Sequence, residues 1–136
     1  MKIVVCLDDR DGMLFNRRRQ SKDSALRKRV LERAEKLWMN CYSAAQFSDV
    51  PDRIVIDENF LDKAGQQDWC FLENTDISAY AQRVSGVILY RWNREYPRDM
   101  TFPTELFSHR WTLVHRADFP GNSHQMITEE IYEIQR

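Results

Sequence analysis

The sequence has few glycines, prolines and cysteines, and it has no long hydrophobic run. Of its 136 residues, four are glycine, four are proline and three are cysteine. The longest wholly apolar run extends only from Ile3 to Leu7, whereas a membrane-spanning helix needs about 20 apolar residues. No signal-peptide pattern precedes this run, so we expect a cytoplasmic chain with no membrane partner.

The three cysteines do not suggest a disulfide framework. Cys6, Cys41 and Cys70 are odd in number and widely spaced, which is unlike the paired cysteines of small secreted domains. Each lies in an apolar stretch that resembles a strand. We therefore expect three buried, reduced thiols.

Motifs of several enzyme classes are also absent. The only histidines are His109, His115 and His124, and none belongs to a zinc-binding pattern such as His-Glu-x-x-His. Neither Gly-x-Ser-x-Gly nor a Walker-type Gly-x-x-x-x-Gly-Lys occurs. We expect no metal site, and no motif supports a metallo-nuclease, a serine hydrolase or a P-loop protein.

A net charge of −1 hides an uneven distribution of charge. Residues 17–36 contain nine basic and three acidic side chains, whereas residues 37–136 contain nine basic and fifteen acidic ones. The basic segment could attract an anionic partner. The alternative is that these charges form an ordinary solvated helix face.

Hydrophobic periodicity predicts the first part of the fold. Residues 2–7 form a continuous apolar run, typical of a central strand covered on both faces. Residues 8–22 show no sustained period and predict a long surface loop. A helix is then predicted to start with Ser21 or Asp23 as its N-cap and to bury an apolar stripe.

The rest of the chain predicts alternating strands and short helical segments. Strands are expected at residues 37–42, 53–56, 69–72 and 87–92, and helical turns at 43–47 and 77–84. Such alternation favours parallel pairing. Residues 111–119 and 125–134 flank Pro-Gly-Asn-Ser-His and predict a hairpin. We expect one α/β domain over residues 1–136: a mixed, mostly parallel central sheet with flanking helices and a C-terminal antiparallel hairpin.

Several short strings, in consistent order, resemble the dihydrofolate reductase family. Val50-Pro51-Asp52-Arg53 is similar to the family's Leu-Pro-Gly-Arg, and Asp99-Met100-Thr101-Phe102-Pro103 is similar to its Asp-Thr-x-Phe-Pro. Trp111, Asn122-Ser123-His124 and Ile131-Tyr132-Glu133-Ile134 fall at family-like spacing near the closing hairpin. The resemblance covers most of the chain and implies the family's fold.

The family's catalytic carboxylate has no direct counterpart. In the family, a carboxylate on the first helix hydrogen-bonds the pteridine and supports its protonation. An alignment without gaps places Ser24 there. Asp23 is adjacent, but one residue along a helix is about 100° of rotation. Asp23 is therefore only a weak catalytic candidate, which would require a shift of register.

The cofactor motifs are missing as well. Where the family receives NADPH phosphates on a Gly-Arg pair, this sequence has Asn40-Cys41. The family's second phosphate site is a Gly-Gly pair between a strand and a helix, but no two glycines are adjacent here. The resemblance implies that this strand and helix are lost near residues 83–88. No cofactor is expected, and NADPH remains only an alternative.

Other matching positions suggest scaffolding or ligand contacts. Gly12, Asp99 and Ser123 match residues that position the family's active-site loop, although they could simply cap turns. Arg53 matches the arginine that grips the substrate's carboxylate, and a surface ion pair is the competing reading.

A persisting family pocket would be unusually charged. Its wall would include Asp11, and the ligand-binding candidates are Arg17, Arg19, Ser24, Lys28, Arg53 and Tyr90. If an uncharged pteridine bound against such a wall, the cations would lose their water without gaining a partner. The same wall would suit a phosphate, a nucleotide or an acidic peptide.

We therefore predict a divergent protein of this fold, without reductase activity, that binds an anionic ligand or partner through its basic loop and helix. One alternative is an NADPH-dependent reductase of a pteridine-like substrate with a rearranged cofactor site. The other is a nucleic-acid-binding module that uses residues 17–36.

Overall fold

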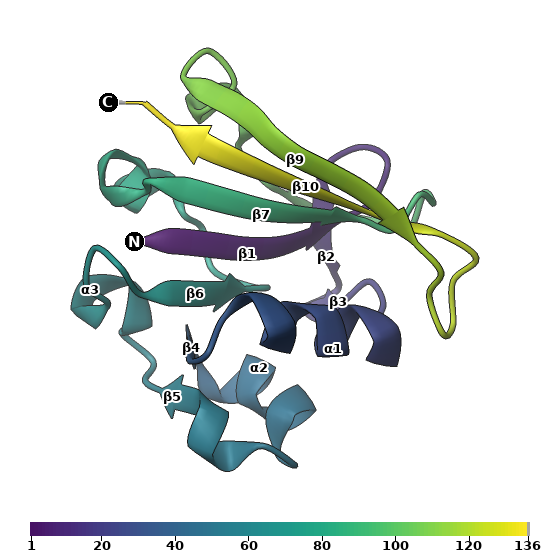
Figure 1. The fold of residues 1–136 in the computed structure, drawn as a ribbon, viewed down its shortest axis with the longest axis horizontal. Coiled ribbons are helices and arrows are strands. Elements are labelled where there is room, and N and C mark those ends of the chain that lie inside the picture. Colours follow the sequence, from purple (N-terminus) through teal and green to yellow (C-terminus); the bar gives the residue numbers. More distant parts are fainter. Residues whose placement is uncertain (136) are drawn as a thin grey trace.

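A seven-stranded sheet forms the centre of the computed structural model, which describes residues 1–135 (Figure 1). Its order is β5-β4-β6-β1-β7-β10-β9. The strands are β1 (Lys2–Leu7), β4 (Leu37–Met39), β5 (Ile54–Ile56), β6 (Trp69–Leu72), β7 (Gly86–Arg91), β9 (Trp111–Phe119) and β10 (Ile127–Ile134). Pairing is parallel from β5 to β7, and β10 is antiparallel to both β7 and β9. The predicted mixed sheet with its closing hairpin is confirmed.

The predicted long loop at residues 8–22 instead contains two strands of a second, small sheet. Its strands are β2 (Gly12–Phe15), β3 (Arg18–Arg19) and β8 (Met100–Thr101), in the order β3-β2-β8. The turn between β2 and β3 places Asn16 and Arg17 at φ values of 52° and 62°. Two residues with positive φ are typical of a tight hairpin turn. The sequence did not predict this hairpin, because its strands are too short to show the alternation of apolar and polar residues that is typical of a strand.

The helices are short except for the first one. They are α1 (Ser24–Arg33), α2 (Cys41–Ala44) and α3 (Phe60–Lys63), with 3₁₀ helices η1 (Ala45–Phe47), η2 (Pro51–Arg53), η3 (Ser78–Arg83) and η4 (Thr104–Leu106). Asp23 is the N-cap of α1, as one of the two predictions had it. Within residues 1–135, no helix has the length and apolar character needed to cross a membrane.

One prediction for the middle of the chain was wrong. The strand expected at residues 37–42 ends at Met39, because the Asn40 side chain accepts a hydrogen bond from the Ser43 N–H and starts α2. Further along, the chain passes from β6 through η3 to β7, close to the strand, helical turns and strand predicted at residues 69–72, 77–84 and 87–92.

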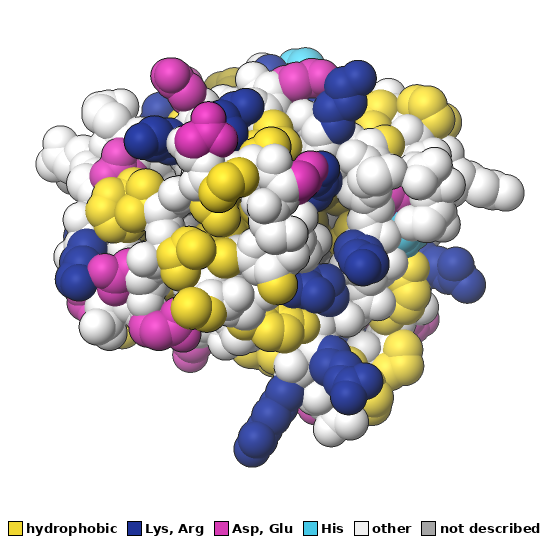
Figure 2. Space-filling view, turned by 90° about the horizontal axis from the view of Figure 1, so that it is seen from below, with side chains coloured by type: hydrophobic (Ala, Val, Ile, Leu, Met, Phe, Trp, Pro, Cys, Tyr) yellow, Lys and Arg dark blue, Asp and Glu magenta, His cyan; other side chains and the backbone are white. Residues whose placement is uncertain are grey.

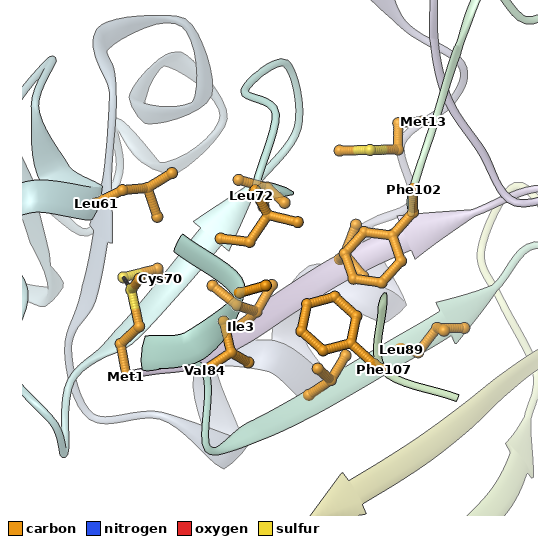
Figure 3. Packing of buried hydrophobic residues seen from close by; sticks show 14 of the residues in the cluster. Met1, Ile3, Met13, Leu61, Cys70, Leu72, Val84, Leu89, Phe102 and Phe107 are labelled. Carbon is orange, nitrogen blue, oxygen red and sulfur yellow. Dashed lines mark hydrogen bonds between the residues drawn. The ribbon is translucent and has the colours of Figure 1, made fainter. Parts of the chain in front are cut away.

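Hydrophobic side chains pack on both faces of the sheet, as the apolar run of β1 predicts. Ile3 and Val5 belong to a cluster on one face, whereas Val4 belongs to the cluster on the other face beneath α1. In the first cluster the rings of Phe102 and Phe107 stack with their centroids 5.6 Å apart (Figure 3). Both faces of the central strands are therefore covered.

A buried carboxylate fixes α1 to the sheet. Glu129 on β10 is fully buried and accepts hydrogen bonds from Arg29 at 3.1 Å and from Arg33 at 2.7 Å, both on α1. It also accepts a bond from the Tyr90 hydroxyl, and the His115 Nε2 lies 3.2 Å away. Burial would raise the pKa of Glu129, but the bonds from these partners, Arg33 foremost, lower it to about 2. Two of the basic residues of α1 are thus engaged inside the molecule.

Candidate functional site

Arg19 turns inward and is neutralised by an acid. The guanidinium of Arg19, on β3, lies 2.9 Å from Glu73, which follows β6. Glu73 also accepts hydrogen bonds from the Ser43 hydroxyl and the Gln46 side-chain amide. The Glu73 side chain is only 10% exposed. Arg19 is therefore a structural partner of Glu73 and not a free cation awaiting a ligand.

The small, partly enclosed cavity beside this pair has no room for a pteridine ring. Its volume is about 20 Å³, which is close to the space that one water molecule requires. Its lining residues include Cys6, Arg19, Ser21, Leu26, Phe47, Glu73 and Trp92. Of the residues expected to form a charged pocket wall, Arg19 alone is among those that line this cavity, and Glu73 neutralises it.

Asp23 is buried and saturated with hydrogen bonds. Its Oδ1 accepts from the N–H groups of Ala25 and Leu26 at the start of α1. Its Oδ2 accepts from the Ser123 N–H at 2.8 Å and the Asn122 N–H at 2.9 Å, in the β9–β10 connection. Burial would raise the pKa of Asp23, but these hydrogen bonds outweigh it and hold the pKa well below its usual range. An ionised, fully occupied carboxylate is ill suited to supply a proton to a pteridine.

His124 joins Asp23 to the segment between β3 and α1. The His124 Nδ1 lies 3.0 Å from Asp23 Oδ2, and its Nε2 lies 3.0 Å from the Ser21 hydroxyl and 2.9 Å from the Tyr96 hydroxyl. The imidazole stacks on Trp92 with ring centroids 4.5 Å apart. Apart from the family-like Asn122-Ser123-His124 string, no pattern in the sequence indicated this cluster, because Ser21 and His124 are 103 positions apart.

Gly121 permits the close approach of this connection to α1. A Cβ atom at Gly121 would lie 2.7 Å from both Asp23 Oδ2 and the His124 carbonyl oxygen. Such distances are too short for a carbon atom, so only glycine fits here without a shift of the backbone. Ser123, predicted to position a loop, has its hydroxyl 3.1 Å from Asp23 Oδ2 and 3.0 Å from the Lys22 carbonyl oxygen, and it can donate its proton to either acceptor.

Three of the predicted ligand-binding residues meet on the outer side of α1. Ser24, Lys28 and Arg53 line an open groove of about 630 Å³, here called the α1 groove, which is completed by Ala25, Arg27, Leu31, Glu32, Gly121 and Asn122. Ser24 is exposed and belongs to this outer groove. It therefore does not take the interior place of the family's catalytic carboxylate. The α1 residue that is buried at the enclosed cavity is the apolar Leu26.

Arg53 caps the C-terminal end of α1. Its guanidinium donates to the carbonyl oxygens of Leu31, Ala34 and Glu35. Leu31 lies in the last turn of the helix, and the other two residues follow its end. A cation at this end also complements the helix dipole. Neither of the two readings made from the sequence, a carboxylate grip or a surface ion pair, anticipated this capping role. The positively charged guanidinium of Arg53 still borders the α1 groove.

Tyr90 and Arg17 do not share a site with these residues. Tyr90 on β7 is completely buried, and its hydroxyl donates to Glu129. Burial, together with the neighbouring Glu129 charge, strongly raises the pKa of this tyrosine. Arg17 is exposed at the β2–β3 turn. The expected single pocket formed by all six ligand-binding candidates is therefore divided among separate parts of the molecule.

Gly12 and Asp99 hold the small sheet together. The Gly12 N–H donates to Asp8 Oδ1 at 2.7 Å, and a Cβ atom here would meet Gln20 Nε2 at 2.6 Å. Asp99 Oδ2 accepts from the Asn16 N–H at 3.0 Å, in the β2–β3 turn. These contacts stabilise the hairpin that follows β1.

The position that resembles the family's Gly-Arg pair is occupied by an internal hydrogen bond. The Cys41 N–H, at the start of α2, donates to Glu58 at 2.7 Å. Nearby, the side chain of Asn40 donates to Asn74 at 2.7 Å. Glu73, which precedes Asn74, adds a negative charge that Arg19 offsets.

One of the three cysteines is exposed, contrary to the prediction from the sequence. Cys70 is buried in β6 and Cys6 is partly buried in β1, but Cys41 is exposed at the start of α2, so the prediction of three buried thiols was wrong at one position. The neighbouring Glu58 raises the pKa of Cys41, which opposes thiolate formation. Residues 1–135 contain no group of three His, Cys, Asp or Glu side chains arranged to hold a metal ion.

The basic segment is less available than its composition suggests. Arg27 forms a two-bond pair with Asp49 at 2.7–2.8 Å. Arg19, Arg29 and Arg33 are paired with buried or partly buried acids. On the face shown in Figure 2, basic side chains are scattered among apolar and acidic ones. A continuous basic surface does not cover this face.

Comparison with solved structures identifies the fold. The chain is similar to dihydrofolate reductase from Enterococcus faecalis, solved as a complex with NADP(H) and RAB-propyl, with a TM-score of 0.70 and 10% sequence identity. The match covers 99% of this chain and 96% of that chain. No family model and no curated protein sequence matches the chain. The protein therefore has a dihydrofolate-reductase-like fold, and the comparison carries no further than the fold.

Proposed function

We propose that this dihydrofolate-reductase-like domain does not reduce folates with NADPH and instead binds a small anionic ligand in the α1 groove. The observation that carries the proposal is the hydrogen bond from the Cys41 N–H to Glu58, at the position that resembles the family's phosphate-binding Gly-Arg pair. This carboxylate uses a donor that a cofactor phosphate would need. The α1 groove, in contrast, retains exposed basic charge for an anion.

The interior of the domain gives independent support for the loss of reductase activity. A cavity of about 20 Å³ leaves no room for a pteridine, and the apolar Leu26 is the buried α1 residue beside it. Arg19 and Glu73 both line this cavity, and their bonds at 2.9 and 3.2 Å involve both carboxylate oxygens. A ligand that displaced either side chain would first have to break these bonds.

Lys28 makes the α1 groove the best remaining anion site. It is exposed on the outer side of α1, and Arg53 contributes positive charge to the same groove, whereas Arg27 is paired with Asp49. The exposed Ser24 hydroxyl and Asn122 lie at the N-terminal end of the groove and can supply neutral hydrogen bonds. Glu32 opposes these charges, which favours a small anion near Lys28 over a long polyanion.

The first test measures cofactor binding directly. Titration with NADPH should leave the tryptophan fluorescence of the protein unchanged at micromolar concentrations, because Trp92 lines the closed cavity. NADPH oxidation in the presence of dihydrofolate should not exceed the rate without protein. The reductase from Enterococcus faecalis serves as the positive control. Saturable quenching, or oxidation that depends on dihydrofolate, would favour the divergent reductase instead.

The second test measures anion binding by calorimetry with pyrophosphate as the probe. Lys28→Glu should weaken binding by about tenfold, equivalent to about 1.4 kcal/mol. The matched control is Lys36→Glu, which makes the same charge change at an exposed position outside the α1 groove. Equal effects of the two variants would indicate non-specific electrostatic attraction and would contradict a binding site in the α1 groove. Tighter binding of an oligonucleotide, with strong salt dependence, would favour the nucleic-acid alternative.

A further inference from the structure

We propose that Ser21, His124 and Asp23 form an acyl-transfer site in which Ser21 is the nucleophile and His124 is the general base. The proposal is independent of the anion site in the α1 groove. The three residues lie in one hydrogen-bonded row, from the Ser21 hydroxyl to His124 Nε2 and from His124 Nδ1 to Asp23 Oδ2, with both distances 3.0 Å. A nucleophile, a base and a carboxylate in this order are recognised by geometry and not by sequence position.

The carboxylate determines which nitrogen of His124 can act as a base. Asp23 is ionised and can only accept, so its contact with Nδ1 places the imidazole proton on that nitrogen. The lone pair of Nε2 is then available to the Ser21 hydroxyl. The other contacts of Asp23, from α1 and from the β9–β10 connection, fix the carboxylate in place. Asp23 is in this sense a positioning residue.

Packing holds the imidazole in the same orientation. The His124 side chain is 4% exposed, and its ring stacks on Trp92 and packs edge-on against Tyr96. Ser21 is only partly buried and lines the enclosed cavity. The base is therefore shielded from water, whereas the hydroxyl that it would activate borders both the cavity and the surface. This division suits a nucleophile that must meet a substrate.

Tyr96 shares the base with Ser21. Its hydroxyl lies 2.9 Å from Nε2, so only one of the two hydroxyls can donate to the single lone pair at a time. When Tyr96 donates, Ser21 is not activated. Removing the Tyr96 hydroxyl should therefore favour the productive arrangement, which gives the proposal a test in the direction of increased rate.

The reaction would proceed in two steps with water as the co-reactant. Ser21 Oγ bonds to the carbonyl carbon of an ester while its proton passes to His124 Nε2. The bond from that carbon to the leaving oxygen then breaks, and the leaving oxygen takes the proton from Nε2. Water next attacks the acyl-serine and gives one proton to Nε2. That proton returns to Ser21 Oγ as the acyl bond breaks, and a carboxylic acid is released.

The surroundings of Ser21 limit the substrate to a short acyl group. The cavity of about 20 Å³ can accept a methyl group but not a long chain or an aromatic ring. Within residues 1–135, no hydrogen bond of the Lys22 backbone N–H is found, and this group directly follows the nucleophile. An N–H in that position contributes to the oxyanion site of many serine hydrolases. We therefore infer an acetyl or similarly short ester as the substrate class.

The decisive experiment traps the acyl-enzyme. The protein is incubated with p-nitrophenyl acetate, quenched in acid and digested, and the peptide that contains Ser21 is examined by mass spectrometry. We expect an acetyl group on Ser21. Hydrolysis should fall at least about a hundredfold in Ser21→Ala, and it should rise in Tyr96→Phe. Ser108→Ala, at an exposed serine outside the site, should leave the rate unchanged.

Each way in which the acyl-transfer proposal could fail gives a different experimental result. Acetyl groups found only on lysine side chains such as Lys22, or a rate unchanged in Ser21→Ala, would overturn the proposal. Circular dichroism and the unfolding midpoint of Ser21→Ala establish that the variant folds. Loss of activity in Tyr96→Phe, with the fold intact, would also contradict the competition between the two hydroxyls. None of these results bears on pyrophosphate binding in the α1 groove.

Discussion

Replacing Glu129 with glutamine should lower the free energy of unfolding by about 3 kcal/mol, at the lower end of the range for breaking a buried ion pair. The carboxylate is fully buried, whereas its partners Arg29 and Arg33 are 28% and 35% exposed. The arginines can therefore recover part of their hydration when the charge is lost, which keeps the cost from being larger. Urea unfolding followed by tryptophan fluorescence measures the change.

Glu133→Gln is the matched control for this variant. Glu133 lies on the same strand but is exposed, so its replacement should change stability by less than about 0.5 kcal/mol. A similar small effect at Glu129 would mean that the contacts from α1 contribute little in solution. A loss of several kcal/mol at both positions would point to the strand itself and not to the ion pair.

The pH dependence of stability provides a second readout for Glu129. The native structure lowers the pKa of this group from 4.5 to about 2, so its ionised form is stabilised by folding. The contribution is fully present above about pH 4.5 and is lost as the pH falls through about 2. The urea concentration at the unfolding midpoint should therefore decrease as the pH is lowered from about 5 to about 2, because this range spans the unfolded and native pKa values. Glu129→Gln should show a flatter decrease than Glu133→Gln.

Asp23→Asn should be destabilising by about 3 kcal/mol, because several buried donors lose their acceptor at once. The amide that replaces Oδ2 would face the N–H groups of Asn122 and Ser123, and neither can accept a hydrogen bond. Either orientation of the asparagine side chain leaves donors unsatisfied, since Oδ1 is also occupied by Ala25 and Leu26. Thermal unfolding by circular dichroism measures the loss.

Asp9→Asn controls for the same chemical change. Asp9 is exposed, and its replacement should shift the unfolding midpoint only slightly. Because folding also lowers the pKa of Asp23, the difference between the two variants should narrow as the pH falls below about 4, where the carboxyl group starts to protonate in the unfolded chain. A difference that is independent of pH would argue that Asp23 acts by shape alone.

The architecture was predictable from the sequence because its signals are local or repeated. Residues 3–7 form an uninterrupted apolar run, and β1 lies between β6 and β7 with both faces covered. Two long strand-like segments around Pro-Gly-Asn-Ser-His became β9 and β10. The N-cap of α1 was also readable, since aspartate is among the residues preferred there.

The buried polar contacts were not predictable, because they depend on partners far away in the chain. An alternating strand pattern places Glu129 on one face but cannot show that Arg29 and Arg33 will neutralise it there. The same holds for Arg19, which composition alone assigns to a basic patch although Glu73 removes it from the surface charge. Charge counts along the sequence therefore overestimated the number of unpaired basic side chains at the surface.

The attachment of α1 has a consequence for the order in which the protein folds. Its two principal anchors, Asp23 to Ser123 and Arg33 to Glu129, join residues 100 and 96 positions apart. A helix of ten residues is marginal by itself in water, so α1 needs those contacts to persist. Contacts between such distant residues form slowly because closing a long loop costs entropy. During synthesis, α1 must therefore wait until the segment about 100 residues further along the chain has been made before it can dock.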